Sequence, residues 1–435
     1  MRDDQTPTPF TPDAARSLDG PDWLRARRTA AAEAFAAAPL PTSDEEVWRY
    51  SRVDDLDLGA FAPSGPPATV DVPAQLGGLL GAVVESAATV VVRNGRLVHA
   101  HVREALAAKG LRVDAATADD EGALGAALRE APDAFATLND AFTVEPVVVR
   151  VPAGMTVDGP VVVAHWTEGP GGAAAGPGRV ATFPRLVVLA GDDSEVAVLE
   201  VQASDGAASL VVPVTEIVAA RAARVGHVTV QQLGMATWQL GLQTSRLDAE
   251  STLRSTSVMF GGDYARLRTD CRMDGRGATG ELDAVYFGEG DQTLDVRTFQ
   301  NHVAPDCTSN LLFKGAVGGR SRSVYTGMIH VGKAARGTNA FQTNRNVKLS
   351  DEAWAESVPN LVIENNDVRC SHASAVGPID EEQRFYIESR GVPSDVAERL
   401  VVTGFFDEVL GRLPVPAVAP PLRATVAAKF ERRGS

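Results

Sequence analysis

Residues 281–331 read ELDAVYFGEGDQTLDVRTFQNHVAPDCTSNLLFKGAVGGRSRSVYTGMIHV. Four short apolar or alternating runs lie in this stretch, and Gly, Asp or Asn stands at the breaks between them. Runs of this kind, bounded by turn-forming residues, are typical of β-strands. Similar runs recur from about Val144 to Val368 at intervals of roughly 8–15 residues, without a convincing helical period. We therefore expect the middle of the chain to be mainly β.

The length of this β-rich part favours a solenoid over a sandwich or a barrel. An ordinary sandwich has about 100 residues, far fewer than this part contains. The runs show no strict short repeat, so a β-helix built from them must be irregular. Each coil of a solenoid buries its apolar face only against its neighbours, and both ends need caps. We accordingly divide the chain into an N-terminal helical and mixed region (1–145), a β-helix core (146–370) and a C-terminal helical region (371–435).

Local signals predict the elements of the N-terminal flank. Residues 21–38 are rich in Ala, Arg and Glu, which favours a helix. Further helices are expected over 101–109 and 119–130. Asn94-Gly95 lies between two apolar runs, which predicts a β-hairpin with a type I′ turn.

The C-terminal flank contains signals for two helices. Asp380 is expected to cap the first, which ends near Gly391. Ser394 or Asp395 is expected to cap the second. The predicted apolar stripe of the second helix consists of Val396, Leu400, Val401, Phe405 and Val409.

The overall charge and the cysteine content exclude several classes of protein. The net charge is −15 and the pI is about 5.0, which argues against binding to nucleic acid or to an anionic membrane surface, since both need basic patches. The three scattered cysteines form no disulfide framework and fit a reducing cytoplasm. No apolar run approaches the roughly 20 residues of a membrane span, and the N-terminus does not resemble a secretory signal.

Candidate chemistry is concentrated in Cys370-Ser371-His372. Side chains two residues apart in an extended segment share a face, so this thiolate and imidazole are plausible ligands for iron. An iron–sulfur cluster usually takes four ligands. The others would come from another chain or from Cys271, Cys307 or His302. The glycine-rich stretch 315–321 lacks the lysine and the spacing of a phosphate-binding loop, so we expect no nucleotide hydrolysis in this chain.

Three stretches of the chain resemble the SufB/SufD family of iron–sulfur cluster assembly proteins. They are NHVAPDCTSNLLFKGAVGGRSRSVYTGMIHV (301–331), ARGTNAFQTNRNVKLSD (335–351) and AWAESVPNLVIENNDVRCSHASAVGPIDEEQRFYIESRGV (353–392). The segment CSHASAVG (370–377) is most similar to the SufD branch, although Ala373 and Ser374 stand where that branch usually has Gly and Ala.

The resemblance implies a right-handed parallel β-helix flanked by helical regions. It also implies a non-catalytic scaffold subunit that pairs with a SufB-like paralogue and a SufC-like ABC ATPase, which hydrolyses the ATP. His372, with Cys370 as a weaker candidate, would lie at the subunit interface and contribute to a transient cluster, and no tightly bound cofactor is expected. The ATPase would dock on a surface made of Phe385, Tyr386, Arg390, Gly391, Gly404 and Phe405.

Other functions stay open at the level of the sequence. The chain could be a structural or adaptor β-solenoid without metal, or a homodimer. It could also be a carbohydrate-active β-helix enzyme, for which Glu281, Asp291 and Asp295 are available carboxylates. Co-purification with an ATPase, together with the iron content, would separate these alternatives.

Overall fold

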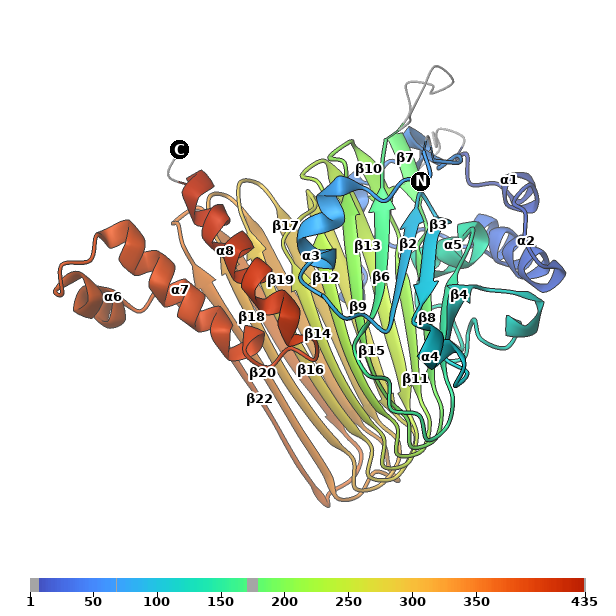
Figure 1. Cartoon of the computed structure of the whole chain (residues 1–435). Coiled ribbons are helices and arrows are strands. Elements are labelled where there is room, and N and C mark those ends of the chain that lie inside the picture. Colours follow the sequence, from blue (N-terminus) through green and yellow to red (C-terminus); the bar gives the residue numbers. More distant parts are fainter. Residues whose placement is uncertain (1–7, 68, 170–178, 434–435) are drawn as a thin grey trace.

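The computed structural model describes residues 8–67, 69–169 and 179–433. It is mainly β, with 42% strand and 23% helix, and it forms a parallel β-solenoid of about seven turns with flanking helices (Figure 1). The predicted fold class is therefore confirmed. None of the helices in these described ranges has the length and apolar character that crossing a lipid bilayer requires.

Two sheets form the walls of the solenoid, one with 12 strands and one with ten. From β11 onward successive strands alternate between the walls, so that each coil adds one parallel strand to each wall. Tyr264 lies opposite Thr293, and Thr293 lies opposite Arg322, so a coil takes 29 residues at this point (264, 293, 322).

Each strand belongs to one of the two walls. The 12-stranded sheet contains β1 Phe61–Pro63, β4 Arg112–Ala115, β5 Val147–Val151, β7 Arg179–Thr182, β8 Arg185–Ala190, β10 Ser209–Val211, β11 Val214–Ala219, β13 Thr237–Leu247, β15 Tyr264–Met273, β17 Thr293–His302, β19 Arg322–Val331 and β21 Trp354–Ile363. The ten-stranded sheet contains β2 Ala88–Arg93, β3 Arg96–Val102, β6 Val161–Thr167, β9 Glu195–Ser204, β12 Arg224–Gln232, β14 Thr252–Met259, β16 Thr279–Gly288, β18 Thr308–Val317, β20 Thr338–Lys348 and β22 Val368–Pro378.

Helices lie at both flanks of these walls (Figure 1). The α-helices are α1 Pro12–Arg16, α2 Asp22–Ala37, α3 Gly77–Leu80, α4 Glu104–Ala107, α5 Ala134–Phe142, α6 Glu381–Glu388, α7 Ser394–Leu410 and α8 Ala419–Arg433. Short 3-10 helices are found at Glu46–Trp48, Val53–Asp55, Leu58–Ala60, Ala74–Leu76, Ala118–Asp120 and Pro416–Val418.

Apolar side chains pack on the inner and the outer faces of both walls. The interior of the solenoid is packed with residues such as Val163 and Leu186. The outer face of the ten-stranded sheet lies under α7 and α8, where Phe406 is buried. The outer face of the 12-stranded sheet lies under the N-terminal segments, where Trp48 and Phe135 are buried. Burial on both faces explains why many strands read as continuous apolar runs.

The predicted β-hairpin is confirmed, whereas the helix expected over 119–130 is wrong. Asn94 and Gly95 have φ angles of +45° and +80°, as a type I′ turn requires. Beyond Asp120 the chain stays irregular because the carboxylate of Glu216 on β11 accepts hydrogen bonds from three backbone N–H groups. These belong to Gly125, Ala127 and Leu128, at 2.8, 2.9 and 2.9 Å. The helix expected over 101–109 shrinks to α4, because β3 continues to Val102.

At the C-terminal flank, Asp380 caps α6 as predicted, through hydrogen bonds from the N–H groups of Glu382 and Gln383. The predicted cap of α7 is wrong, because Pro393 stands at that position and no side chain caps the helix. Of the predicted stripe on α7, Val401, Phe405 and Val409 pack against the sheet, whereas Leu400 is 50% exposed. The buried face of α7 consists of Ala397, Val402, Phe406, Val409 and Leu410.

The last strand of the solenoid, β22, runs to Pro378. The solenoid therefore continues beyond residue 370, and His372 lies on a strand of the ten-stranded sheet rather than in the C-terminal helical region.

Candidate functional site

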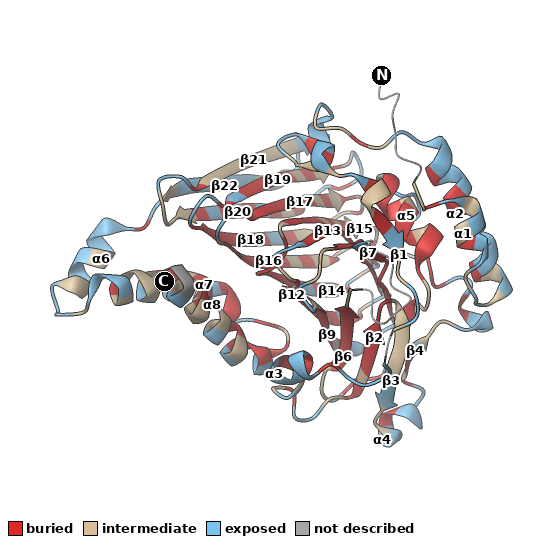
Figure 2. Cartoon of the chain, turned by 90° about the horizontal axis from the view of Figure 1, so that it is seen from above, coloured by how far each residue is buried: buried red, intermediate tan, exposed pale blue. Residues whose placement is uncertain are grey.

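The C-terminal end of the solenoid exposes two long strands, β21 and β22. Within the described residues β21 pairs only with β19, and β22 pairs only with β20. Every residue of these two strands is half-buried or exposed, and Figure 2 shows this change of colour towards the last coil. One edge of each wall is thus free to contact another molecule.

Cys370 and His372 lie on β22 and share one face of it. Cys370 lies opposite Ala340 of β20, and His372 lies opposite Gln342. Ala340 and Gln342 are both buried, so this row of side chains points into the solenoid. The same row on β22 is left uncovered at the end of the stack, where His372 is exposed and Cys370 is half-buried.

The two candidate ligands differ in their surroundings. Cys370 packs against an apolar cluster that includes Ile329, Ala335 and Leu361. Burial raises the pKa of the Cys370 thiol, which favours the neutral thiol at neutral pH. The exposed imidazole of His372 is the more accessible donor.

A polar network runs from this edge into the interior. Ser374 on β22 donates a hydrogen bond to Ser357 (2.7 Å), and Ser357 donates to the side-chain oxygen of Asn344 (2.8 Å). Asn344 in turn donates to the hydroxyl of Tyr286 (2.8 Å). The amide of Gln342, directly beneath His372 in the stack, has no hydrogen-bond partner among the described atoms. Gln342 and Ser374 are thus the neighbours of His372 on β20 and β22, and the sequence patterns did not predict this network.

The other predicted ligands lie away from this edge. Cys271, Cys307 and His302 are completely buried, and burial raises the pKa of Cys271 to about 11. Cys307 donates to the carbonyl of Gly275 at 3.3 Å, and His302 is 2.9 Å from the hydroxyl of Ser309. The structure therefore does not bring these three residues to His372. Within the described ranges, no group of three or more His, Cys, Asp or Glu side chains could hold a metal ion.

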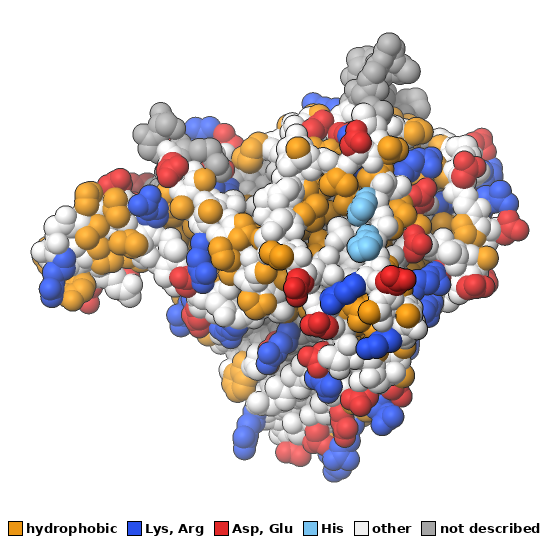
Figure 3. Space-filling view, viewed as in Figure 1, with side chains coloured by type: hydrophobic (Ala, Val, Ile, Leu, Met, Phe, Trp, Pro, Cys, Tyr) orange, Lys and Arg blue, Asp and Glu red, His pale blue; other side chains and the backbone are white. Residues whose placement is uncertain are grey.

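The predicted docking residues are divided between α6 and α7. None of the eight described residues of α6 is buried, and Phe385 and Tyr386 are 70% and 60% exposed. Arg390 lies over the ring of Tyr386, 5.1 Å from its centroid. Gly391, with a φ of +85°, forms the turn between the two helices. Hydrophobic side chains gather on this projecting lobe (Figure 3).

In contrast to α6, α7 is fixed to the solenoid. Lys314 on β18 is buried, and its ammonium group donates to the carbonyl oxygen of Phe405 at 2.8 Å and to the carboxylate of Glu408. The hydrogen bond from Lys314 lowers the pKa of Glu408. The same ammonium group lies 4.4 Å from the centroid of the Phe405 ring. Gly404, by contrast, is exposed.

A surface pocket of about 770 Å³ connects the free edge of β22 with the two helices. Its lining includes Val376 from β22, Gln383 from α6, and Leu400, Gly404 and Phe405 from α7. The candidate docking surface and the candidate cluster edge are thus neighbours.

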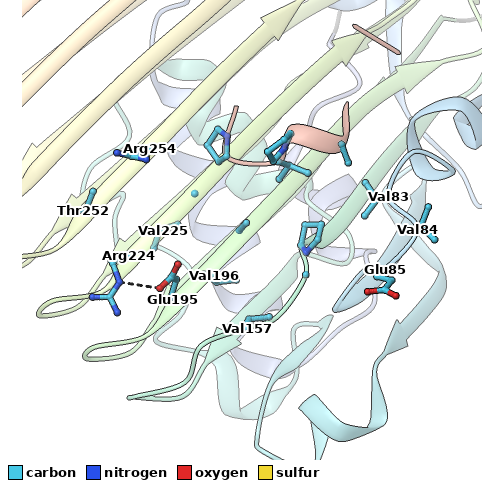
Figure 4. A pocket seen from close by; sticks show the side chains of 18 residues that line it. Val83, Val84, Glu85, Val157, Glu195, Val196, Arg224, Val225, Thr252 and Arg254 are labelled. Atoms are coloured by element: carbon cyan, nitrogen blue, oxygen red, sulfur yellow. Dashed lines mark hydrogen bonds and ion pairs between the residues drawn. The ribbon is translucent and has the colours of Figure 1, made fainter. Parts of the chain in front are cut away.

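Several other charged side chains of the solenoid form ion pairs with each other. A second pocket, of about 730 Å³, is lined by residues that include Arg224, Glu195 and Arg254. Arg224 forms an ion pair with Glu195 (Figure 4), and Arg254 forms one with Glu281. The carboxylates considered for a carbohydrate-active site are also paired with arginines. The pairs are Glu281 with Arg254 (2.9 Å), Asp291 with Arg320 (2.7 Å) and Asp295 with Arg266 (2.8 Å).

Comparisons with known proteins show which family this chain resembles. The family model described as SUF system FeS cluster assembly, SufBD core domain matches residues 173–405, which is more than half of the chain. A protein of Mycobacterium tuberculosis, named as an iron-sulfur cluster assembly SufBD family protein, is 37% identical over 70% of this chain and 74% of its own length. The iron-sulfur cluster assembly protein SufD of Escherichia coli is 27% identical over 85% of this chain and 84% of its own length. SufD of Bacillus subtilis is 24% identical over 94% and 95%. The chain therefore belongs to the SufBD family of iron–sulfur cluster assembly proteins.

Proposed function

We propose that this chain is a SufD-type, non-catalytic subunit of a scaffold on which iron–sulfur clusters are assembled. The observation that carries the proposal is the position of His372, an interior-facing residue that is exposed because it lies in the last coil. The assignment to the SufD branch is supported by the segment CSHASAVG (370–377) and by the similarity to two proteins named SufD.

The partner at the free edge is a second β-solenoid, and we propose a SufB-like paralogue. Unpaired strands template pairing with other chains, and natural proteins usually protect them. β21 and β22 are ten and 11 residues long, which is long enough to continue both walls into another solenoid. A second copy of this chain is the competing occupant.

The cluster is the cargo of this interface rather than a resident cofactor. His372 supplies an imidazole and Cys370 is the weaker second donor, while the partner contributes the remaining ligands. Ligands divided between two chains make release responsive to movement of the subunits, which suits a scaffold that must pass its cluster on.

The second partner is a SufC-like ABC ATPase that binds the lobe formed by α6 and the adjacent part of α7. The exposed rings of Phe385 and Tyr386 supply apolar contact area, and Arg390, Gly391, Gly404 and Phe405 complete the surface. ATP hydrolysis in the partner would move α6 relative to α7, which Lys314 holds in place. We assign the complex to the cytoplasm, where the three free cysteines would stay reduced.

Replacing His372 tests the proposal directly. We would co-express the His372→Ala variant anaerobically with the candidate paralogue and ATPase, then measure complex formation by size-exclusion chromatography and the bound iron and sulfide. The complex should form normally, and cluster content should fall at least about tenfold, as metal sites do when their ligation is impaired. His330→Ala, which changes a half-buried histidine of β19, is the matched control and should leave both unchanged. An intact complex with unchanged cluster content would exclude the role of His372.

A further inference from the structure

The two terminal strands of the ten-stranded sheet each carry a pair of metal-ligating residues at the same spacing. β22 carries Cys370 and His372, and β3, at the opposite end of the sheet, carries His99 and His101. The proposed function uses the first pair only. The second pair has no role in it.

His99 and His101 point to the same face of β3. In the antiparallel pairing of β3 with β2, His101 lies opposite Thr89 and His99 lies opposite Val91. Val91 belongs to the apolar cluster on the outer face of the ten-stranded sheet. Both histidines are exposed, and Figure 3 shows two histidine side chains next to each other on this side of the molecule.

A β-bulge fixes the direction of this part of β3. The register shifts between Val91 and Val92, because Val91 lies opposite His99 whereas Val92 lies opposite Leu97. Val98 is therefore an extra residue, and it packs with the outer cluster, while Leu97 packs with the interior cluster. Bulges commonly reorient side chains beside functional sites, and here the strand is held on both faces immediately before His99.

Both imidazoles are available for ligation. Neither His99 nor His101 makes a hydrogen bond or ion pair with any of the residues that the structure describes. Residues i and i+2 of a strand are about 6.8 Å apart, and side chains of the length of histidine can converge over this distance on one ion with metal–nitrogen bonds of about 2.1 Å.

We propose that His99 and His101 form a chelating site for a divalent first-row transition-metal ion on the outer face of β3. Imidazole suits nickel, copper and zinc, and affinity for such a site rises toward copper. Two protein ligands leave the remaining positions to water, so the ion exchanges readily. This site needs no partner chain and is independent of the proposed function.

Calorimetric titration with Ni²⁺ tests the site. The background is the full chain with Cys370→Ser and His372→Ala, which removes the donor pair at the other end of the sheet. We expect each chain in this background to bind one Ni²⁺ ion at this site. His99→Ala and His101→Ala should each weaken binding at least tenfold, because each converts a chelate into a single ligand. Unchanged affinity in either variant would overturn the proposal.

A spacing variant separates chelation from the mere presence of two histidines. His99→Ala combined with Ala100→His keeps two imidazoles on β3 but places them on opposite faces, since Ala100 pairs with Val90 of the interior row. We expect the same loss as for His99→Ala alone, and retained affinity would contradict the geometry. Electron paramagnetic resonance of bound Cu²⁺ should show two nitrogen ligands in the background protein and one in each single variant. A thermal melt confirms that these exposed positions leave the fold intact.

Discussion

The two ends of the solenoid are finished in opposite ways. At the N-terminal end, β3 turns back antiparallel on β2 and β4 pairs antiparallel with β5, and helices cover the outer faces. Interior residues there, such as Val161 and Leu186, are completely buried. At the C-terminal end, the interior row continues through Cys370, His372 and Ser374, and two of these three residues are exposed.

A buried arginine shows how firmly the N-terminal end is closed. The guanidinium of Arg28 on α2 donates hydrogen bonds to the carbonyl oxygens of Leu18, Asp19, Thr143 and Val144. Burial lowers the pKa of Arg28 to about 10. The helix and the chain that leads into the solenoid are thereby joined. No comparable tether covers the described residues of β22, so the free edge is the end at which a partner would complete the structure.

Two matched Leu→Ala substitutions, one near each end of the solenoid, should give the largest difference in the free energy of unfolding. Leu186 on β8 and Leu361 on β21 belong to the same wall and face the interior, but only Leu186 is fully buried. Leu186→Ala should lower the free energy of unfolding by about 2–5 kcal/mol. Leu361→Ala should cost less than about 1 kcal/mol in the isolated chain, since little contact is lost. Urea denaturation measures both, and equal losses would show that the open end is packed as tightly as the closed one.

The pH dependence of stability should show the effect of burying His302 inside the solenoid. Burial, with a smaller effect of the nearby His330, lowers the pKa of His302 from 6.5 to about 4. Between these values the unfolded chain binds a proton that the native chain does not bind, so stability is full above pH 6.5 and falls as the pH decreases. The contribution of His302 to the loss between pH 7.5 and 5 should be about 2 kcal/mol.

The variant His302→Gln should remove this part of the pH dependence. Urea midpoints at pH 7.5 and 5 give the comparison. Glu200, whose pKa is lowered to about 2 chiefly through its hydrogen bond with His227, against the opposing effect of burial, affects stability only below this window. Burial also lowers the pKa of His165 and raises the pKa of Asp283 to about 6, and these two groups change stability in this window with opposite signs. The difference between the His302→Gln variant and the wild type therefore decides the assignment, and an identical pH dependence of the two chains would contradict it.

The sequence predicted the walls of the solenoid better than it predicted the free edge. Strands such as β6, with seven buried residues in succession, are apparent from their apolar runs. The apolar runs did not predict β13, β15, β20 and β22. On β20 the interior row includes Gln342, Asn344 and Asn346, which are buried and polar, so the usual pattern of apolar residues inside is reversed.

The position of His372 on one face with Cys370 followed from their spacing, whereas its exposure did not. Exposure depends on how many coils follow, and a local pattern does not contain that information. The network of Ser357, Ser374 and Asn344 joins three different strands, which only the register of the coils brings together. The alternation in TNAFQTNRNVK (338–348) is the signal that could have revealed β20.

A charge on the free edge should affect association rather than folding. Ala373 is exposed on β22, and Ala100 is exposed on β3, the other terminal strand of the same sheet. Ala373→Lys should change the stability of the isolated chain by less than about 0.5 kcal/mol, because lysine is well tolerated on edge strands. It should weaken binding to the paralogue, or to a second copy, at least tenfold, equivalent to about 1.4 kcal/mol.

Ala100→Lys is the matched control for this substitution and should not affect association. Sedimentation or light scattering with each partner gives the comparison. Equal binding by the wild type and the Ala373→Lys variant would show that the interface does not include β22.

The smallest effect on stability is expected in α6, where the open end extends into solvent. None of the eight described residues of α6 is buried. Replacing both Phe385 and Tyr386 by Ala should therefore shift the free energy of unfolding by less than about 0.5 kcal/mol. Binding of the ATPase, measured by pull-down and calorimetry, should nevertheless weaken several-fold, since exposed aromatic anchors often dominate interfaces. Met235→Ala, a change at a similarly exposed position between β12 and β13, is the control for loss of surface apolar area. If the double variant binds as tightly as the wild type, the exposed rings serve some other contact, and α7, held by Lys314, becomes the candidate docking element.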